Sequence, residues 1–197
     1  MPPKAKFTRD IIIQAGLSIV RENGIEALTA RALGAKLGSS ARPIFTVFQS
    51  MDEVQAEVKE SAKSIYDEYV RKGLEQELAF KGVGTQYIVF AIQEPKLFQL
   101  LFMSEQEQPP KVVNVMPIID DNYEDILLSV QNGYHLSKNA AEQLYRHLWI
   151  YTHGIAVLCA TNMCIFTPEE INKMISQVFK GVLKEIIQEN GIGGNCE

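Results

Sequence analysis

Cysteine and long apolar runs are scarce in this chain of 197 residues. Its three cysteines, Cys159, Cys164 and Cys196, have spacings that match neither a zinc site nor a redox pair. They fit a reducing compartment, and we expect Cys159 and Cys164 to lie on a buried face. The first residues lack the apolar region of a signal peptide, and no uncharged apolar run reaches the roughly 18 residues that span a bilayer. The sequence predicts a cytoplasmic protein without a membrane partner.

Motifs of catalysis and cofactor binding are missing as well. The chain has only three histidines, His135, His147 and His153, and none joins a cysteine or serine in a recognisable catalytic pattern. His147 and His153 are six residues apart, so one helix face would not present both to a metal ion. No glycine-rich phosphate loop follows a strand pattern. We therefore expect no enzyme activity, no metal site and no cofactor.

Helical apolar periodicity is what the chain does contain. Hydrophobic residues make up 46% of the sequence, which is enough for a substantial core, and neither an alternating strand pattern nor an internal repeat is present. We predict an all-α fold with two domains. Residues 1–50 would form a three-helix helix-turn-helix domain, and residues 51–197 a helical bundle.

The N-terminal quarter is basic although the whole chain is acidic. Residues 1–50 carry a net charge of +4, whereas the rest of the chain carries −9. Because neutralisation of phosphates dominates DNA affinity, this distribution favours a nucleic-acid reader joined to an acidic body. Chance clustering of cations would give the same pattern, so charge alone does not decide.

Three short helices are predicted in this quarter. Thr8 can cap the first helix, which Gly24 ends, and Thr29 can cap the second, which ends at 38–40. The third helix would cover 39–48, with Pro43 in its first turn, where a missing N–H costs little. This is the helix-turn-helix arrangement, in which the last helix enters the major groove. Three apolar side chains are expected to pin that helix to the core: Ile44, Phe45 and Phe48.

The stretch from Ile12 to Val54, IIQAGLSIVRENGIEALTARALGAKLGSSARPIFTVFQSMDEV, resembles the DNA-binding domain of the TetR family. The resemblance implies an all-helical homodimeric repressor with a variable C-terminal effector domain. The sequence departs from the family pattern at Arg42-Pro43, where a Gly-Thr pair is common, and at Met51, where a lysine is common. We therefore expect an atypical operator.

Arg42 is the best candidate for reading a base, because a guanidinium can contact guanine O6 and N7 together. Hydroxyls, cations and helix starts nearby are candidates for phosphate contacts, although each is equally compatible with a helix cap or a solvated residue. The predicted DNA-binding residues are Thr29, Lys36, Ser40, Ala41, Arg42, Pro43 and Thr46. Lys4, Lys6 and Arg9 would form either a basic arm or a solvated terminus.

Beyond residue 50 the sequence predicts further helices. Their expected ranges are 50–80, 85–93, 95–103, 120–131, 137–162 and 167–190, with a loop over 104–117. The last helix carries an apolar stripe that includes Phe179 and Val182 and is wider than one core needs. We interpret this width as a homodimer interface made with the preceding helix. The alternative is a larger core within a monomer.

A small-molecule site is predicted from aromatic and polar side chains in the body. The predicted ligand-binding residues are Tyr87, Phe90, Phe98, Phe102, Tyr123, Trp149 and His153. Aromatic side chains at helical spacing also fit an ordinary core, and a lone helical histidine is usually a core or interface residue. The run from Trp149 to Gly154 is similar to a Trp and His-Gly signature of some TetR-family C-terminal domains.

The function that these observations predict is a DNA-binding repressor that a small hydrophobic ligand releases from double-stranded operator DNA. The alternative is a helical ligand-binding or protein-interaction module that has lost specific DNA binding.

Overall fold

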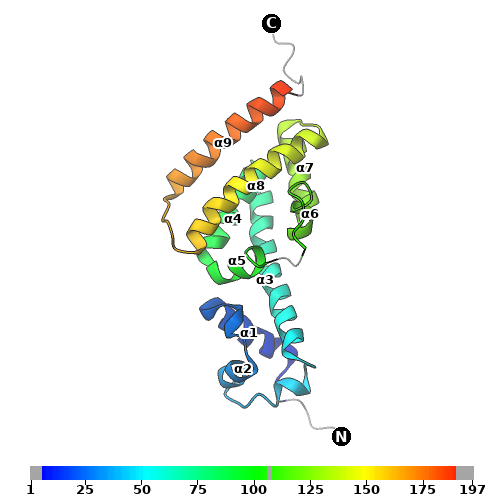
Figure 1. Cartoon of the computed structure of the whole chain (residues 1–197), viewed down its shortest axis with the longest axis vertical. Helices are drawn as coiled ribbons and strands as arrows, with labels where there is room; N and C mark the ends of the chain where they lie inside the picture. Colours follow the sequence, from blue (N-terminus) through cyan, green and yellow to red (C-terminus); the bar gives the residue numbers. More distant parts are fainter. Residues whose placement is uncertain (1–5, 106–107, 190–197) are drawn as a thin grey trace. The chain divides into compact units, whose positions relative to one another are not determined.

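The computed structural model describes residues 6–105 and 108–189, and these residues contain helices and no strand (Figure 1). The predicted all-α fold is therefore confirmed. The helices are α1 (Arg9–Asn23), η1 (Ile25–Ala27), α2 (Ala30–Lys36), η2 (Ile44–Thr46), α3 (Met51–Leu74), α4 (Ala79–Gln93), α5 (Pro95–Phe102), α6 (Met116–Ile119), α7 (Tyr123–Tyr134), α8 (Lys138–Ala160) and α9 (Pro168–Glu189). Within the described ranges, none of them is both long and apolar enough to cross a membrane.

The chain forms two compact units, and α3 belongs to both. The first unit holds the residues up to Tyr66 together with Glu94–Glu105, so that it contains α1, α2, most of α3 and α5. The second unit holds Asp67–Gln93 and the helices from α6 onward.

The helix caps of the first unit are those that the sequence predicts. The Thr8 hydroxyl accepts a hydrogen bond from the Ile11 N–H at 3.3 Å, and the Thr29 hydroxyl accepts one from the Ala32 N–H at 3.2 Å. Gly24 ends α1 with a φ of 85°, a conformation that favours glycine. The N-terminal boundaries of α1 and α2 therefore follow from local sequence.

The long helix after Ser50 ends at Leu74, earlier than predicted, and Gly82 lies inside α4 rather than at a helix end. The reason is a close crossing of α3 and α4. A Cβ on Gly73 would lie 2.6 Å from the Cα of Val83, and a Cβ on Gly82 would overlap the carbonyl oxygen of Gly73. These glycines serve helix packing, which local sequence does not distinguish from a helix stop.

α7 begins and ends three residues later than predicted, at Tyr123 and Tyr134. Asp120 is extended, with a φ of −136°, and its carboxylate accepts a hydrogen bond from the Asn122 N–H at 2.9 Å, so the helix cannot start there. The helix passes through the expected stop at Gly133 and ends where His135 adopts a left-handed φ of 53°.

α8 is the central helix of the second unit and packs against α4, α7 and α9 (Figure 1). The predicted capping box of α9 is confirmed, because Thr167 and Glu170 exchange hydrogen bonds of 2.8 and 3.2 Å. Most of the apolar stripe of α9 is only half-buried within the chain. The Phe179 side chain already has a contact within the chain, because its ring centre lies 4.9 Å from the ring centre of Tyr134.

Candidate functional sites

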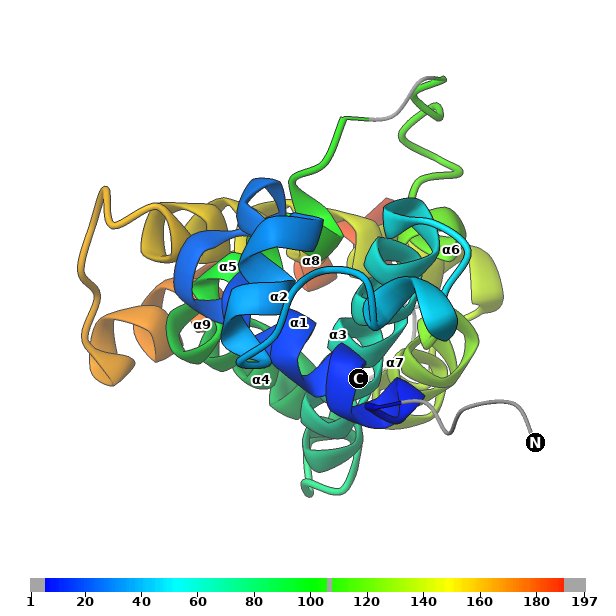
Figure 2. The same ribbon diagram turned by 90° about the horizontal axis from the view of Figure 1, so that it is seen from below.

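The expected third helix is reduced to the single 3-10 turn η2, and Figure 2 shows the chain between α2 and α3 mainly as a loop. The prediction of a full helix over 39–48 is wrong at this point. Pro43 has no N–H to donate, and its ring disfavours helical backbone at Arg42. The Thr46 hydroxyl also donates to the Pro43 carbonyl at 2.7 Å, which competes with regular helix bonding.

This reading turn, residues 41–49, still has an inner and an outer face. Ile44 is fully buried and Phe48 is 2% exposed, so these two side chains hold the turn to the core as expected. Phe45 was expected to do the same, but its side chain is 46% exposed. The outer face is made of residues at helical spacing that are all exposed: Arg42, Phe45, Thr46 and Gln49. Phe45 and Gln49 are surface residues of the turn that the sequence pattern does not indicate.

The turn lies against α2 at Gly34. A Cβ at Gly34 would come within 2.9 Å of the Ala41 nitrogen and of the Ser40 carbonyl carbon. The end of α2 is fixed by two further hydrogen bonds, from the Gly38 N–H to the Ala35 carbonyl at 3.0 Å and from the Ser39 N–H to the Gly34 carbonyl at 2.9 Å. The position of the reading turn thus depends on the lack of a side chain at one residue.

Arg9 connects α1 to the start of α3. Its guanidinium bonds to the Glu53 carboxylate at 2.6 Å, pairs with Glu57, and lies 4.3 Å from the ring centre of Phe48. The hydrogen bonds to Glu57 and Glu53 raise the pKa of Arg9 above its usual value. Arg9 is therefore a clamp on the reading turn and not a member of a free basic arm.

The remaining residues of the proposed arm differ from each other. The Lys6 ammonium donates to the Ser39 hydroxyl at 3.0 Å, which places its charge beside the turn, whereas Lys4 lies outside the described residues.

The other predicted DNA-binding residues differ in their exposure and in the contacts that they already make. Thr29 is exposed but caps α2, and Lys36 is exposed but pairs with Glu22 at 2.7 Å. Ser40 is exposed, and Ala41 and Pro43 are half-buried. Among the described residues Arg42 is exposed and has no ion pair, so its guanidinium is available to a ligand.

The predicted ligand-binding residues are divided between the two units. Phe98 and Phe102 belong to the first unit, where their ring centres are 5.4 Å apart. The other five belong to the second unit, where Phe90 is fully buried and the Tyr123 ring stacks on Tyr145 at 5.7 Å. Phe90 and Phe98 are core residues in these environments.

Tyr87, Trp149 and His153 form a contiguous group in the second unit. The Tyr87 hydroxyl lies 2.9 Å from His153 Nδ1, and the Trp149 and His153 rings stack with centres 5.0 Å apart. Burial raises the pKa of the Tyr87 hydroxyl well above its usual value, and the nearby Asp120 carboxylate adds a smaller effect in the same direction. Burial lowers the pKa of His153 and so favours its neutral imidazole, whose tautomer determines which of the two groups donates in this hydrogen bond.

This histidine predicts a pH dependence of stability. The pKa of His153 is lower in the folded chain than its ordinary value of about 6.5, so the unfolded chain binds the proton more readily. The free energy of unfolding is expected to be fully maintained above about pH 6.5 and to fall as the pH drops toward the folded-state pKa. Urea unfolding at several pH values measures this slope.

His153→Gln should reduce the slope, whereas His147→Gln, an exposed histidine on the same helix, should not. An equal slope in the wild type and the His153→Gln variant would contradict the assignment.

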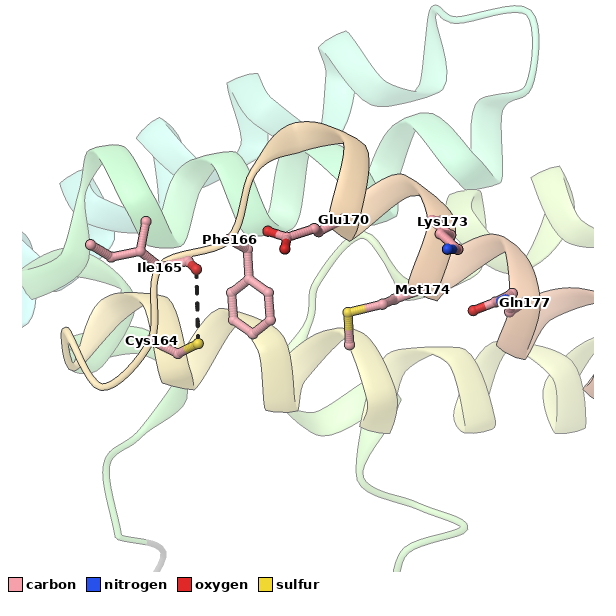
Figure 3. A pocket seen from close by; sticks show the side chains of 7 residues that line it. All are labelled: Cys164, Ile165, Phe166, Glu170, Lys173, Met174 and Gln177. Atoms are coloured by element: carbon pink, nitrogen blue, oxygen red, sulfur yellow. Dashed lines mark hydrogen bonds between the residues drawn. The ribbon is translucent and has the colours of Figure 1, made fainter.

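A separate hollow of about 400 Å³ lies at the turn between α8 and α9 (Figure 3). It is lined by Cys164, Ile165, Phe166, Glu170, Lys173, Met174 and Gln177, none of which is a predicted ligand-binding residue. Cys164 is exposed, so the expectation that it is buried is wrong, whereas Cys159 is half-buried and Cys196 lies outside the described residues. α8 ends at Ala160, Asn162 has a left-handed φ of 55°, and Cys164 lies in the turn beyond it rather than on the helix.

Among the described residues, no group of three or more histidine, cysteine, aspartate or glutamate side chains could hold a metal ion.

The chain is similar in sequence to a bacterial regulator and in structure to a solved repressor. No family model matches the chain. An HTH-type transcriptional regulator of Bacillus subtilis strain 168, YobS, which is described as uncharacterized, is 21% identical over 168 residues, 81% of this chain and 83% of that protein. Both this relative and the structural neighbour are named as regulators of transcription and not as enzymes, which agrees with the expectation of no enzyme activity.

The structural neighbour is SmeT, the repressor of the Stenotrophomonas maltophilia multidrug efflux pump SmeDEF. The two structures agree with a TM-score of 0.51 and 17% sequence identity, over 94% of this chain and 91% of SmeT. The chain therefore shares the all-helical fold of SmeT.

Proposed function

We propose that this chain is a DNA-binding transcriptional regulator of the TetR type that acts as a homodimeric repressor. The observation that carries the proposal is the reading turn, whose outer face presents Arg42 while Ile44 and Phe48 hold it from the inside. The basic balance of residues 1–50 supports it, because the turn lies in a quarter of the chain that carries a net charge of +4 while the rest carries −9. The names of YobS and SmeT point to the same class.

The first test is binding to DNA with a wild-type chain and an Arg42→Ala variant. A duplex enriched by the wild-type chain from a randomised library serves as the operator, and fluorescence anisotropy measures its affinity at several salt concentrations. We expect binding to weaken steeply with salt. Arg42→Ala should lose about 1–3 kcal/mol of discrimination between this duplex and random DNA, because a guanidinium reads guanine through two hydrogen bonds.

Lys81→Ala, which removes an exposed cation from α4, is the matched control and should leave discrimination unchanged. Equal losses on the enriched and the random duplex would mean that Arg42 contacts only phosphate. Failure to enrich any duplex would favour the alternative of a helical module that has lost specific DNA binding, for which the short reading turn is the supporting observation.

The helical body is the proposed effector-binding domain. A repressor is released only by a ligand that binds its DNA-incompetent state more tightly. The group of Tyr87, Trp149 and His153 combines aromatic surface with two polar tips, which is the usual composition of a small-molecule site. We propose a small hydrophobic, aromatic or lipid-like effector that enters near the 104–117 loop. α3, which belongs to both units, would carry the change to the reading turn.

Trp149 is the only tryptophan of the chain, so its fluorescence reports directly on this region. Aromatic compounds that change Trp149 emission are expected to weaken operator binding, and by linkage the operator must weaken the binding of the compound by the same factor. The Tyr87→Phe variant, which keeps the ring and removes the hydroxyl, should change compound affinity. Compounds that alter Trp149 emission without any effect on operator affinity would show that the effector site is elsewhere.

A further inference from the structure

The reading turn offers an unusual surface for a DNA reader. Of the four side chains on its outer face, only Arg42 and Gln49 have freely available polar groups, because the Thr46 hydroxyl already donates to the Pro43 carbonyl. The largest group on this face is the Phe45 ring. Among the described residues it makes no contact with another aromatic ring.

The Phe45 ring is 46% exposed, so it can contact a partner without a rearrangement of the turn. Ile44 and Phe48 fill the core beneath the turn, so the Phe45 ring cannot turn inward without displacing them. The nearby charge favours an anionic partner, since Arg42 lies on the turn, Lys6 donates to Ser39 just before it, and the first 50 residues carry +4. A polyanion with an apolar feature in its groove fits this surface.

We propose that the Phe45 ring, beside the Thr46 methyl group, recognises the C5-methyl group of a pyrimidine in the major groove. In unmodified DNA this group belongs to thymine, and it is the one apolar feature that the major-groove edges of the base pairs offer. A phenylalanine has no hydrogen-bonding atom, so it can favour thymine over cytosine only through this contact. The inference rests on the proposed DNA-binding function and gives a specificity role to a residue other than Arg42.

Substitutions in the DNA test the inference without changing the protein. In the duplex enriched by the wild-type chain, each thymine is replaced in turn by uracil, which removes the C5-methyl group and leaves the hydrogen-bonding edge intact. We expect about a fourfold loss of affinity for each contacted methyl group, the effect of exposing one buried methyl. Replacing the contacted thymine by 5-methylcytosine should be tolerated better than replacing it by cytosine.

Protein variants then assign the contact to Phe45. Phe45→Ala should bind the thymine duplex more weakly and lose its sensitivity to uracil, whereas Phe45→Leu should keep part of that sensitivity. Ile92→Ala removes an exposed apolar side chain from α4 and should behave as the wild type. Circular dichroism and the thermal midpoint of unfolding check that the Phe45 variants are folded. We expect them to fold, because the Phe45 side chain is 46% exposed and contributes little to the core.

The outcomes separate this inference from the proposed function. Selective binding with no response to uracil at any position, or an uracil response that Phe45→Ala retains in full, would overturn the inference and leave the regulator intact. Failure of the wild-type chain to enrich any duplex would overturn both.

Discussion

Replacing Gly34 by valine is expected to abolish specific DNA binding, with a loss of more than about 100-fold in operator affinity, while the helical body stays folded. The Cβ of the new residue would lie within 2.9 Å of backbone atoms of Ser40 and Ala41, so the reading turn must move as a whole. Displacing a recognition element by about 1 Å breaks contacts that depend on hydrogen-bond distances. Anisotropy with the enriched duplex measures the loss.

The matched control is Gly133→Val, at an exposed helical glycine with nothing within 4 Å of its added Cβ. It should retain operator binding and cost no more than a modest change in helix propensity. Trp149 lies in the second unit, so its emission spectrum should be the same in both variants. Operator affinity within threefold of wild type for Gly34→Val would show that the close approach of α2 and the turn does not position the reading residues.

The sequence predicts most of the fold because its helix boundaries are local. Thr8, Thr29, Ser137 and Thr167 each provide the cap that the pattern indicates, since a side-chain oxygen and a nearby N–H are enough to begin a helix. The errors occur where tertiary contact decides. Gly82 supports a helix crossing and does not end a helix, and no local pattern distinguishes these roles.

The candidate sites are predicted less completely for a related reason. Pro43 is expected in the first turn of a helix, but it lies just before η2 as its N-cap, and the sequence pattern does not reveal that only a single 3-10 turn follows. The aromatic character of Phe45 predicts a core position, whereas its ring is 46% exposed and Ile44 and Phe48 lie inside. Similarly, the sequence places Arg9 in a basic arm or a solvated terminus, because its partners Glu53 and Glu57 are far away in the sequence.

Disrupting the proposed homodimer is also expected to cause a large loss of operator affinity. The outer side of α8 carries Ile150, which is 47% exposed, one turn before the exposed Gly154 with open space around its Cβ. Ile150 and the half-buried stripe of α9 are apolar and only partly covered within the chain. We therefore expect Ile150→Glu to give monomers, because it would bury two charges near the symmetry axis of a two-fold interface.

Loss of the dimer should lower operator affinity by more than about 100-fold, since a dimer binds two half-sites as one ligand and a monomer binds only one. Light scattering measures the molecular mass, and anisotropy measures affinity for the enriched duplex and for a single half-site. Ile92→Glu, at an isoleucine that is 50% exposed on α4, introduces the same charge at matched exposure and should stay dimeric. A monomeric Ile150→Glu variant should still bind the half-site weakly, because its reading turn is unchanged. If Ile150→Glu remained a dimer with wild-type affinity, the chain would associate through a surface other than this face of α8.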